Sequence, residues 1–291
     1  MRNKGLTDRM SDRRYLEKLW KCEMGCALDL DHPQTFNEKL QWLKLNDHDP
    51  LYHTLADKIE VKQWVAKRLG EEFIIPTLGV WSNPDIIEYD KLPERFVLKC
   101  NHNSGLGMYI CTDRSKMDTT SVNRMLSEGL SQNYYLMYRE WAYKDIAPRI
   151  LAEEYMECTD ETAGRYGLID YKVHCFNGKP LFIEVIGNRD HASGTARSDL
   201  YDFDWRKLNF SFGDYPSFDG DLPRPQNLEG LYKSAETLSG NMKYVRTDFY
   251  EINGSLKFGE ITFYPNAGMV YYNSVYTPET DLMLGKKIVL D

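Results

Sequence analysis

Residues 244–266 read YVRTDFYEINGSLKFGEITFYPN. Apolar and polar residues alternate on both sides of Asn253-Gly254, which predicts two antiparallel strands joined by a tight turn. We expect a three-residue loop, Asn253-Gly254-Ser255, with Gly254 in the left-handed region. The segment therefore indicates a β-hairpin.

This hairpin carries acidic residues at opposed positions. The period of two places Arg246 and Asp248 on one face of the first strand, and Glu260 and Thr262 on one face of the second. The expected loop pairs Asp248 directly with Glu260, and like charges in that position repel. A divalent cation with oxygen ligands is the expected compensator. Arg246 suits an anionic substrate. The alternative is an ordinary exposed hairpin with scattered charges.

Composition indicates a globular protein. The 291 residues can form one large domain or two to three smaller ones, and 42% hydrophobic content can build a core. A net charge of −8 without a Lys/Arg stripe argues against a general binder of nucleic acid or of anionic membranes. The N-terminus lacks the apolar core of a signal peptide, and no window reaches the length of a transmembrane segment. The six cysteines form no CxxC pair, so we expect a cytoplasmic protein with buried thiols.

The order of predicted elements is helical first and mostly strand afterwards. Thr35 and Glu38 have the spacing of a capping box, and a second helix is expected from Thr54 to Gly70. The remaining predictions are strands at 73–76, 96–99, 108–111, 150–156, 171–176 and 180–186, helices at 119–131, 138–147 and 228–238, and a loop over 198–227.

Three further segments carry chemistry. Lys99 ends a strand before the glycine-containing tip Ser104–Gly107, which suits phosphate binding, although such a tip is usually only a turn. Acidic residues interrupt the apolar run 151–156. Asp170 and Lys172 share a strand face, and residues 188–191 end the paired strand, so the two predict either a substrate site or surface ion pairs.

Taken in order, these segments resemble the ATP-grasp family related to the teichuronopeptide-biosynthesis protein TupA. The resemblance covers nearly the whole chain. It is carried by TFNEKLQWLK (35–44), LADK (55–58), LP (92–93), FVLKCNH (96–102), DYKVHCFNG (170–178), VRTDFY (245–250) and GEITFYP (259–265).

The resemblance implies an α+β ATP-grasp fold in which two α+β lobes hold ATP between them, preceded by a short helical N-terminal region. We expect that helical region over 1–72, the N-lobe with its glycine-tipped hairpin over 73–150, and the C-lobe with the metal-binding hairpin over 151–291.

The resemblance also implies roles for individual residues. Phosphate contacts are expected from Lys58 and Lys99, and loop closure from Ser104, Gly105 and Gly107. Adenine contacts are expected from Glu153, Glu154, Tyr155 and Met156, and a ribose contact from Asp160, with Glu157 as its alternative. Mg²⁺ ligands are expected to be Asp248, Glu260 and Thr262, and the catalytic residues Arg246, Arg189 and Lys172.

Two features depart from the fold's usual pattern. The common E-x-N triplet is here Glu260-Ile261-Thr262, so either Thr262 still reaches a second metal ion or Asn266 compensates. The N-terminal region is too short for the usual preceding substrate domain, and part of the acceptor site can come from elsewhere.

The implied function is ATP- and Mg²⁺-dependent joining of an amine or amino acid to a carboxylate of a cell-surface polysaccharide or its precursor, through an acylphosphate. Peripheral association with envelope-biosynthesis machinery stays open. The alternatives are an ATP-grasp kinase, a non-catalytic nucleotide-binding module and a glycosyltransferase, the last because Asp202-Phe-Asp204 and Asp219-Gly-Asp221 match a D-x-D pattern.

Overall fold

The computed structural model describes residues 7–190, 193–213 and 215–290. Their contacts divide the chain into two compact units. The larger unit combines the part up to His48 with the part from Cys158 onward, and the smaller unit is Asp49–Glu157. This division differs from the three consecutive segments that we expected, because the first helices pack with the C-terminal half of the chain.

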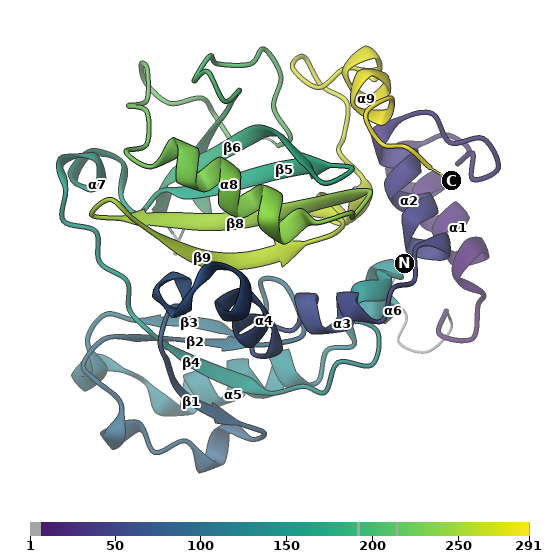
Figure 1. Ribbon diagram of the computed structural model, residues 1–291. Coiled ribbons are helices and arrows are strands. Elements are labelled where there is room, and N and C mark those ends of the chain that lie inside the picture. The colour runs from purple at the N-terminus through teal and green to yellow at the C-terminus, as the bar shows by residue number, and fades with distance from the viewer. Residues whose placement is uncertain (1–6, 191–192, 214, 291) are drawn as a thin grey trace. The chain divides into compact units, whose positions relative to one another are not determined.

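The larger unit contains a five-stranded antiparallel sheet in the order β7-β6-β5-β8-β9. One face is covered by α8, whose Leu231, Ala235 and Leu238 are buried (Figure 1). The elements are α7 (Glu161–Tyr166), β5 (Asp170–Phe176), β6 (Lys179–Asp190), β7 (Thr195–Tyr201), α8 (Leu228–Ser239), β8 (Tyr244–Ile252) and β9 (Ser255–Thr262).

The N-terminal helices α1 (Asp12–Met24) and α2 (Phe36–Asn46) belong to this unit. The predicted capping box is confirmed, since Thr35 Oγ1 accepts from Glu38 N at 3.2 Å and Glu38 Oε2 accepts from Thr35 N at 3.0 Å. Helix α2 lies beside α9 (Pro278–Gly285) (Figure 1). Asn37 donates its backbone N–H to buried Asp281 at 2.9 Å, and Gln41 Nε2 donates to Gly268 O at 2.7 Å. These bonds attach the N-terminal helices to the end of the chain.

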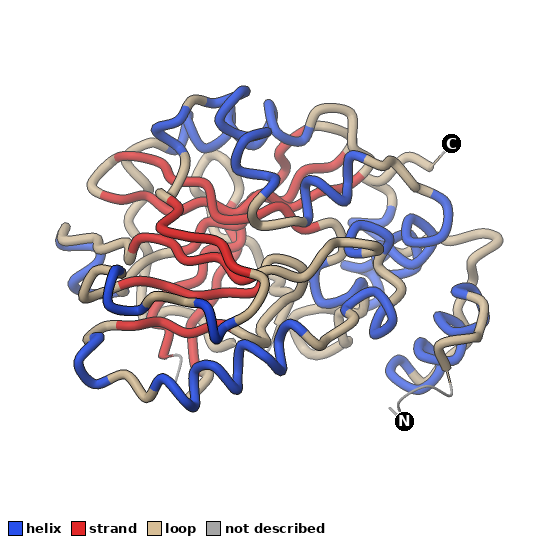
Figure 2. The backbone as a smooth tube through the Cα atoms, turned by 90° about the horizontal axis from the view of Figure 1, so that it is seen from below, coloured by secondary structure: helices blue, strands red, loops and turns tan. Residues whose placement is uncertain are grey.

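The smaller unit has a four-stranded antiparallel sheet in the order β1-β4-β2-β3. Its core packs Phe96, Leu98 and Ile150 of the sheet against Val122 and Leu126 of α5. The strands of both sheets are red in Figure 2. The elements are α3 (Leu51–Ala56), α4 (Glu60–Leu69), β1 (Thr77–Trp81), β2 (Phe96–Cys100), β3 (Met108–Cys111), α5 (Thr119–Leu130), α6 (Tyr134–Tyr138) and β4 (Ile150–Glu154).

Four predicted elements were wrong. The segment 73–76 forms no strand, since a 3₁₀ helix ends at Phe73 and β1 begins at Thr77. The helix expected from Thr54 to Gly70 is two helices, because the Asp57 carboxylate accepts from Ile59 N at 2.8 Å and starts α4. The helix expected at 138–147 does not form; the observed helix, α6, lies before this segment and ends at Tyr138, since Arg139 is left-handed with φ 54°. The loop expected over 198–227 begins with the last residues of β7.

No helix within the described ranges combines the length and the apolar character needed to cross a bilayer.

Candidate functional site

The face of the larger sheet opposite α8 carries a row of charged side chains. Lys172 of β5 pairs in register with Glu184 of β6 on one side and with Asp248 of β8 on the other. Asp248 in turn pairs with Glu260 of β9. Because side chains alternate between the faces of a sheet, these residues and Arg246 face the same way. We call these five residues the charged cluster.

The predicted pairing of Asp248 with Glu260 is confirmed, but the expected three-residue loop is wrong. The turn has two residues, Asn253 and Gly254, with φ of 49° and 80°. A β-bulge then shifts the register, because Gly259 is an extra residue between the paired positions of β9. This shift places Glu260 opposite Asp248.

Protein cations neutralise the opposed carboxylates. Arg246 donates from Nε to Asp248 Oδ1 and from Nη2 to Asp248 Oδ2, both at 2.7 Å. The same Nη2 lies 3.1 Å from Glu260 Oε1 and 3.1 Å from Thr262 Oγ1. The ammonium of Lys172 also contacts Asp248 Oδ2. Arg246 and Lys172 therefore supply positive charge at the position where we expected a metal ion to compensate the acids.

The buried cations of the cluster remain charged. Burial and the nearby Arg246 lower the pKa of Lys172, but the carboxylates of Asp170 and Asp248 raise it, and the net direction is upward. Burial also lowers the pKa of Arg246, and Asp248 more than offsets this, so its pKa lies well above the ordinary value. Lys172 and Arg246 thus carry positive charge on a largely buried part of the sheet face.

Arg189 joins this network through Asp170. Lys172 lies 2.7 Å and Arg189 3.0 Å from Asp170 Oδ2. The Arg189 side chain is 32% exposed, so its guanidinium also faces solvent. The carboxylate of Asp170 raises the pKa of Tyr250 well above its usual value, with burial acting in the same direction. The three predicted catalytic residues, Arg246, Arg189 and Lys172, are thus linked through the acids that they share.

Sequence reasoning missed two residues of this face. Glu184 lies in the charged cluster, and His174 occupies the next position along β5 on the same face. The His174 ring is stacked between Phe182 and Phe212, with centroid distances of 4.6 and 4.8 Å, and its Nδ1 lies 2.7 Å from the Tyr244 hydroxyl. His174 lies two positions after Lys172 on the predicted strand, and this spacing was the sequence signal that could have placed it on the same face. His174 packs the face next to the cluster.

In the smaller unit, Glu153 is buried between two lysines. Its oxygens lie 2.5 Å from Lys62 Nζ and 2.5 Å from Lys99 Nζ. Burial raises the pKa of Glu153, but the Lys99 and Lys62 charges lower it, and the net direction is downward. The Glu153 carboxylate therefore orients Lys99. Lys62 was not predicted, although it lies one helical turn after Lys58.

Lys58 lies at the base of the glycine-containing tip. Its Nζ donates to Asn103 O at 2.5 Å. The exposed tip is Ser104–Leu106, and φ is 83° at Gly105 and 74° at Gly107. The tip is thus held at its base and projects three residues into solvent.

The predicted adenine and ribose residues lie in two different units. Glu154 is exposed, whereas Tyr155 and Met156 are half-buried, and Arg95 lies 5.0 Å from the centre of the Tyr155 ring. Asp160 belongs to the larger unit, where its carboxylate accepts from Ala163 N at 2.8 Å and caps α7.

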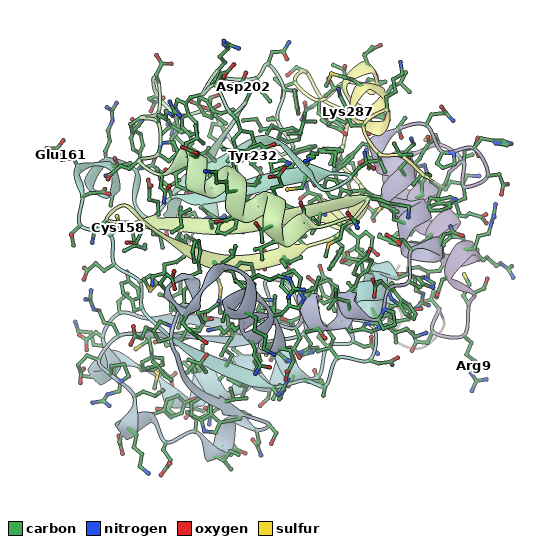
Figure 3. The ribbon with its side chains drawn as sticks, viewed as in Figure 1. Arg9, Cys158, Glu161, Asp202, Tyr232 and Lys287 are labelled. Carbon is green, nitrogen blue, oxygen red and sulfur yellow. The ribbon has the colours of Figure 1, made fainter. Side chains whose placement is uncertain are left out.

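A small pocket of the larger unit lies beside Asp160. Cys158, Tyr171, Arg224 and Glu251 are among its lining residues. Figure 3 labels Cys158 on this side of the unit, near Glu161 of α7. The pocket gives Asp160 a polar surrounding that suits hydroxyl groups.

The two D-x-D triplets are locally engaged. Asp202, labelled in Figure 3, accepts from Asp204 N at 3.0 Å and from Arg206 N at 2.8 Å. Asp219 pairs with Arg197 at 2.9 Å. These acids stabilise turns and strand ends, which does not favour a glycosyltransferase.

The sequence model of the family described as TupA-like ATPgrasp matches residues 38–289. The chain belongs to this TupA-like ATP-grasp family. No curated protein matches it.

Three solved structures show how far the likeness of this TupA-like chain extends. D-alanine-D-alanine ligase from Helicobacter pylori is 18% identical over 81% of this chain and 61% of its own, with a TM-score of 0.40. The Bacillus anthracis enzyme complexed with ATP is 16% identical over 81% of this chain and 68% of its own, with a TM-score of 0.39. The ATP-grasp ligase PsnB complexed with minimal precursor is 10% identical over 82% and 63%, with a TM-score of 0.41. The chain spans 61% of the length of the first of these ligases.

The TupA-like chain offers hard oxygen ligands for Mg²⁺ on the outer side of the charged cluster. Glu260 is 33% exposed at its side chain and uses Oε1 for both of its hydrogen bonds, including 3.4 Å to Thr262 Oγ1. The side chain of Asn266, the expected alternative to Thr262 as a ligand, donates to Phe212 O at 3.0 Å. Within the described residues, no set of three or more His, Cys, Asp and Glu side chains could hold a metal ion. The donor set suits a Mg²⁺ ion that takes most of its ligands from phosphates and water.

Proposed function

We propose that the protein is an ATP- and Mg²⁺-dependent carboxylate–amine ligase that works through an acylphosphate. The charged cluster is the observation that carries this proposal. Arg246 and Lys172 are fixed by Asp248 on one sheet face, beside the partly exposed carboxylate of Glu260. Fixed cations next to a carboxylate that can bind Mg²⁺ suit transfer of a phosphoryl group.

The nucleotide roles follow the expectations from sequence. Lys58 and Lys99 contact phosphates, and the tip with Ser104, Gly105 and Gly107 closes over them. The positive φ of both glycines supports this role, because their backbone N–H groups can approach an anion closely. The segment 153–156 binds adenine and Asp160 binds ribose.

The chain's own residues then act on the acceptor carboxylate. An oxygen of the acceptor carboxylate attacks the γ-phosphorus of ATP. The bond between the γ-phosphorus and the β–γ bridging oxygen breaks, and ADP leaves. Mg²⁺, when bound, neutralises phosphate charge. Arg246, Lys172 and Arg189 stabilise the acyl oxygens. An amine attacks the acyl carbon, inorganic phosphate departs and the amine loses a proton, which leaves an amide.

The acceptor that we propose is a carboxylate of a cell-surface polysaccharide or of its precursor, and the amine is an amino acid or a simple amine. Family membership supports this assignment. We place the reaction in the cytoplasm, with peripheral association with envelope-biosynthesis machinery.

Incubation with ATP, Mg²⁺ and pools of amino acids and uronic acids, with hydroxylamine as a trap, tests the proposal. ADP together with a hydroxamate supports the ligase. A stable phosphorylated product identifies a kinase instead, and release of AMP contradicts the acylphosphate route.

Two variants give this assay matched controls. Arg246→Lys keeps the charge but loses the paired hydrogen bonds to Asp248, so hydroxamate formation should fall. Asp219→Asn should leave turnover unchanged, because Asp219 is exposed and lies outside the cluster. Loss of turnover in Asp219→Asn with retained turnover in Arg246→Lys would favour the glycosyltransferase.

A further inference from the structure

The carboxylate of Asp248 is fully engaged by protein cations. Oδ1 accepts from Arg246 Nε, while Oδ2 accepts from Arg246 Nη2 and contacts the Lys172 ammonium. Asp248 is 2% exposed, so no water replaces these partners. A metal ion that took Asp248 as a ligand would have to displace a buried cation, and leaving such a charge unpaired is costly.

Lys172 cannot easily move away. Its side chain is 9% exposed, and its ammonium lies between Asp248 and Asp170, 2.7 Å from the latter. Its pKa is raised by these acids. Lys172 therefore holds a fixed positive charge where a second divalent ion would otherwise reach Asp248.

Glu260 differs from Asp248 in its exposure and in how many of its carboxylate oxygens are engaged within the cluster. Its side chain is 33% exposed, and the charged cluster occupies only Oε1. Oε2 is left for a ligand, and Thr262 Oγ1 lies beside this carboxylate. A partly exposed carboxylate with a neighbouring hydroxyl suits Mg²⁺ when phosphates complete the coordination.

We propose that the site binds a single divalent cation per chain, through Glu260, and that Asp248 is a positioning residue for Arg246 and Lys172 rather than a metal ligand. The inference rests on the proposed function, since the nucleotide supplies the remaining ligands. Lys172 and Arg246 then provide the charge that a second cation would supply. They do so at the same place in every catalytic cycle, without a binding step.

Electron paramagnetic resonance of Mn²⁺ tests this stoichiometry on the full chain. The chain is present in excess over the non-hydrolysable analogue AMP-PNP, and the mixture is titrated with Mn²⁺. One bound Mn²⁺ per nucleotide complex, with an uncoupled spectrum, is the expected result. Two bound ions with a spin-coupled spectrum would overturn the inference, because metals in two-metal sites lie roughly 3.5–4 Å apart.

The outcomes separate this inference from the proposed function. Two ions leave the ligase proposal intact. If AMP-PNP binds and no Mn²⁺ joins it on the protein, the metal-dependent function itself is wrong.

Two variants locate the ion. Glu260→Gln should weaken Mn²⁺ binding at least about tenfold, because it removes the ligand. Asp248→Asn should change it less than about threefold if the residue only positions its neighbours. Circular dichroism and AMP-PNP binding verify that each variant is folded. Equal weakening by both variants would contradict the assignment of Asp248, and the wild-type spectrum decides the stoichiometry even if Asp248→Asn fails to fold.

Discussion

Replacement of Glu153 by Gln tests the electrostatics of the smaller unit. The change keeps the shape of the side chain but removes the charge that lies 2.5 Å from both Lys62 Nζ and Lys99 Nζ. The two ammonium groups then face one another with no carboxylate between them. We expect a large loss of stability from this nearly isosteric change.

The structure sets the size of the effect. Removing one partner of a buried ion pair costs about 3–5 kcal/mol. Glu153 is 5% exposed, whereas the side chains of Lys62 and Lys99 are 13% and 21% exposed, so Lys99 can relax toward water. The lower end, about 3 kcal/mol of the free energy of unfolding, is therefore expected. That is roughly a hundredfold in the folding equilibrium.

The dependence on pH has a definite sign. The folded-state pKa of Glu153 is lowered from its ordinary value of 4.5 by the charges of Lys99 and Lys62, which outweigh burial, so its ionised form stabilises the protein above that pH. This contribution is lost as the pH falls through the folded-state pKa. The stability gap between wild type and Glu153→Gln should be full near neutral pH and should narrow in acid.

Urea unfolding of wild type, Glu153→Gln and Glu154→Gln measures the gap. Glu154 is the next residue on the same strand and is exposed, so its variant should stay within about 0.5 kcal/mol of wild type. Adding Lys62→Met to Glu153→Gln should recover part of the loss, because one of the two repelling charges disappears. A loss below about 1 kcal/mol in Glu153→Gln, or an equal loss in Glu154→Gln, would refute the reasoning.

Three smaller predictions concern the tip, the helix cap and the charged cluster. Gly105→Ala should cost about 1 kcal/mol of the free energy of unfolding through its positive φ alone. Gly107→Ala should cost at least about 1 kcal/mol more, because its added Cβ would lie 2.6 Å from Cys100 Sγ; equal losses in urea would contradict this. Thr35→Ala should lose about 1 kcal/mol by removing the capping box of α2, measured in the same way; no loss would mean that the cap is not stabilising. Arg246→Lys should lower kcat roughly a hundredfold with a smaller change in KM for ATP, and a change confined to KM would show that the guanidinium acts only in binding.

The parts of the fold that local patterns determine could be predicted from sequence. Alternation identified β8 and β9, and the S/T-x-x-E spacing located the start of α2. The pairing of Asp248 with Glu260 was predicted from a three-residue loop, and it holds because the bulge at Gly259 supplies the shift that the loop was expected to give. The attachment of the N-terminal helices to the C-terminal half could not be predicted. It depends on contacts such as Asn37 to Asp281, and no local pattern encodes a bond across 244 residues.

The candidate site also has one part that could be predicted from sequence and one part that could not. Periodicity placed Arg246 with Asp248 on one face of a strand and Lys172 with Asp170 on one face of another, and the structure brings Arg246 and Lys172 together on Asp248. Lys62 was missed because a lysine on a helix is ordinarily a solvated residue, and only the fold shows it beside buried Glu153. The residue-level roles in catalysis stay predictions.

The β-bulge at Gly259 separates the geometry of the hairpin tip from that of the charged cluster. If β9 continued in regular register beyond Phe258, Gly259 would lie opposite Asp248, and Glu260 would lie opposite Thr247 on the side of α8, since a slip by one position reverses every side chain of a strand. The bulge lies between the turn and the cluster, so the bulge, and not the turn Asn253-Gly254, determines which side chains of β9 face the cluster. A lengthened turn can therefore be accommodated at the tip, whereas closing the bulge with Gly259 still in the chain would turn the strand's acidic side inward.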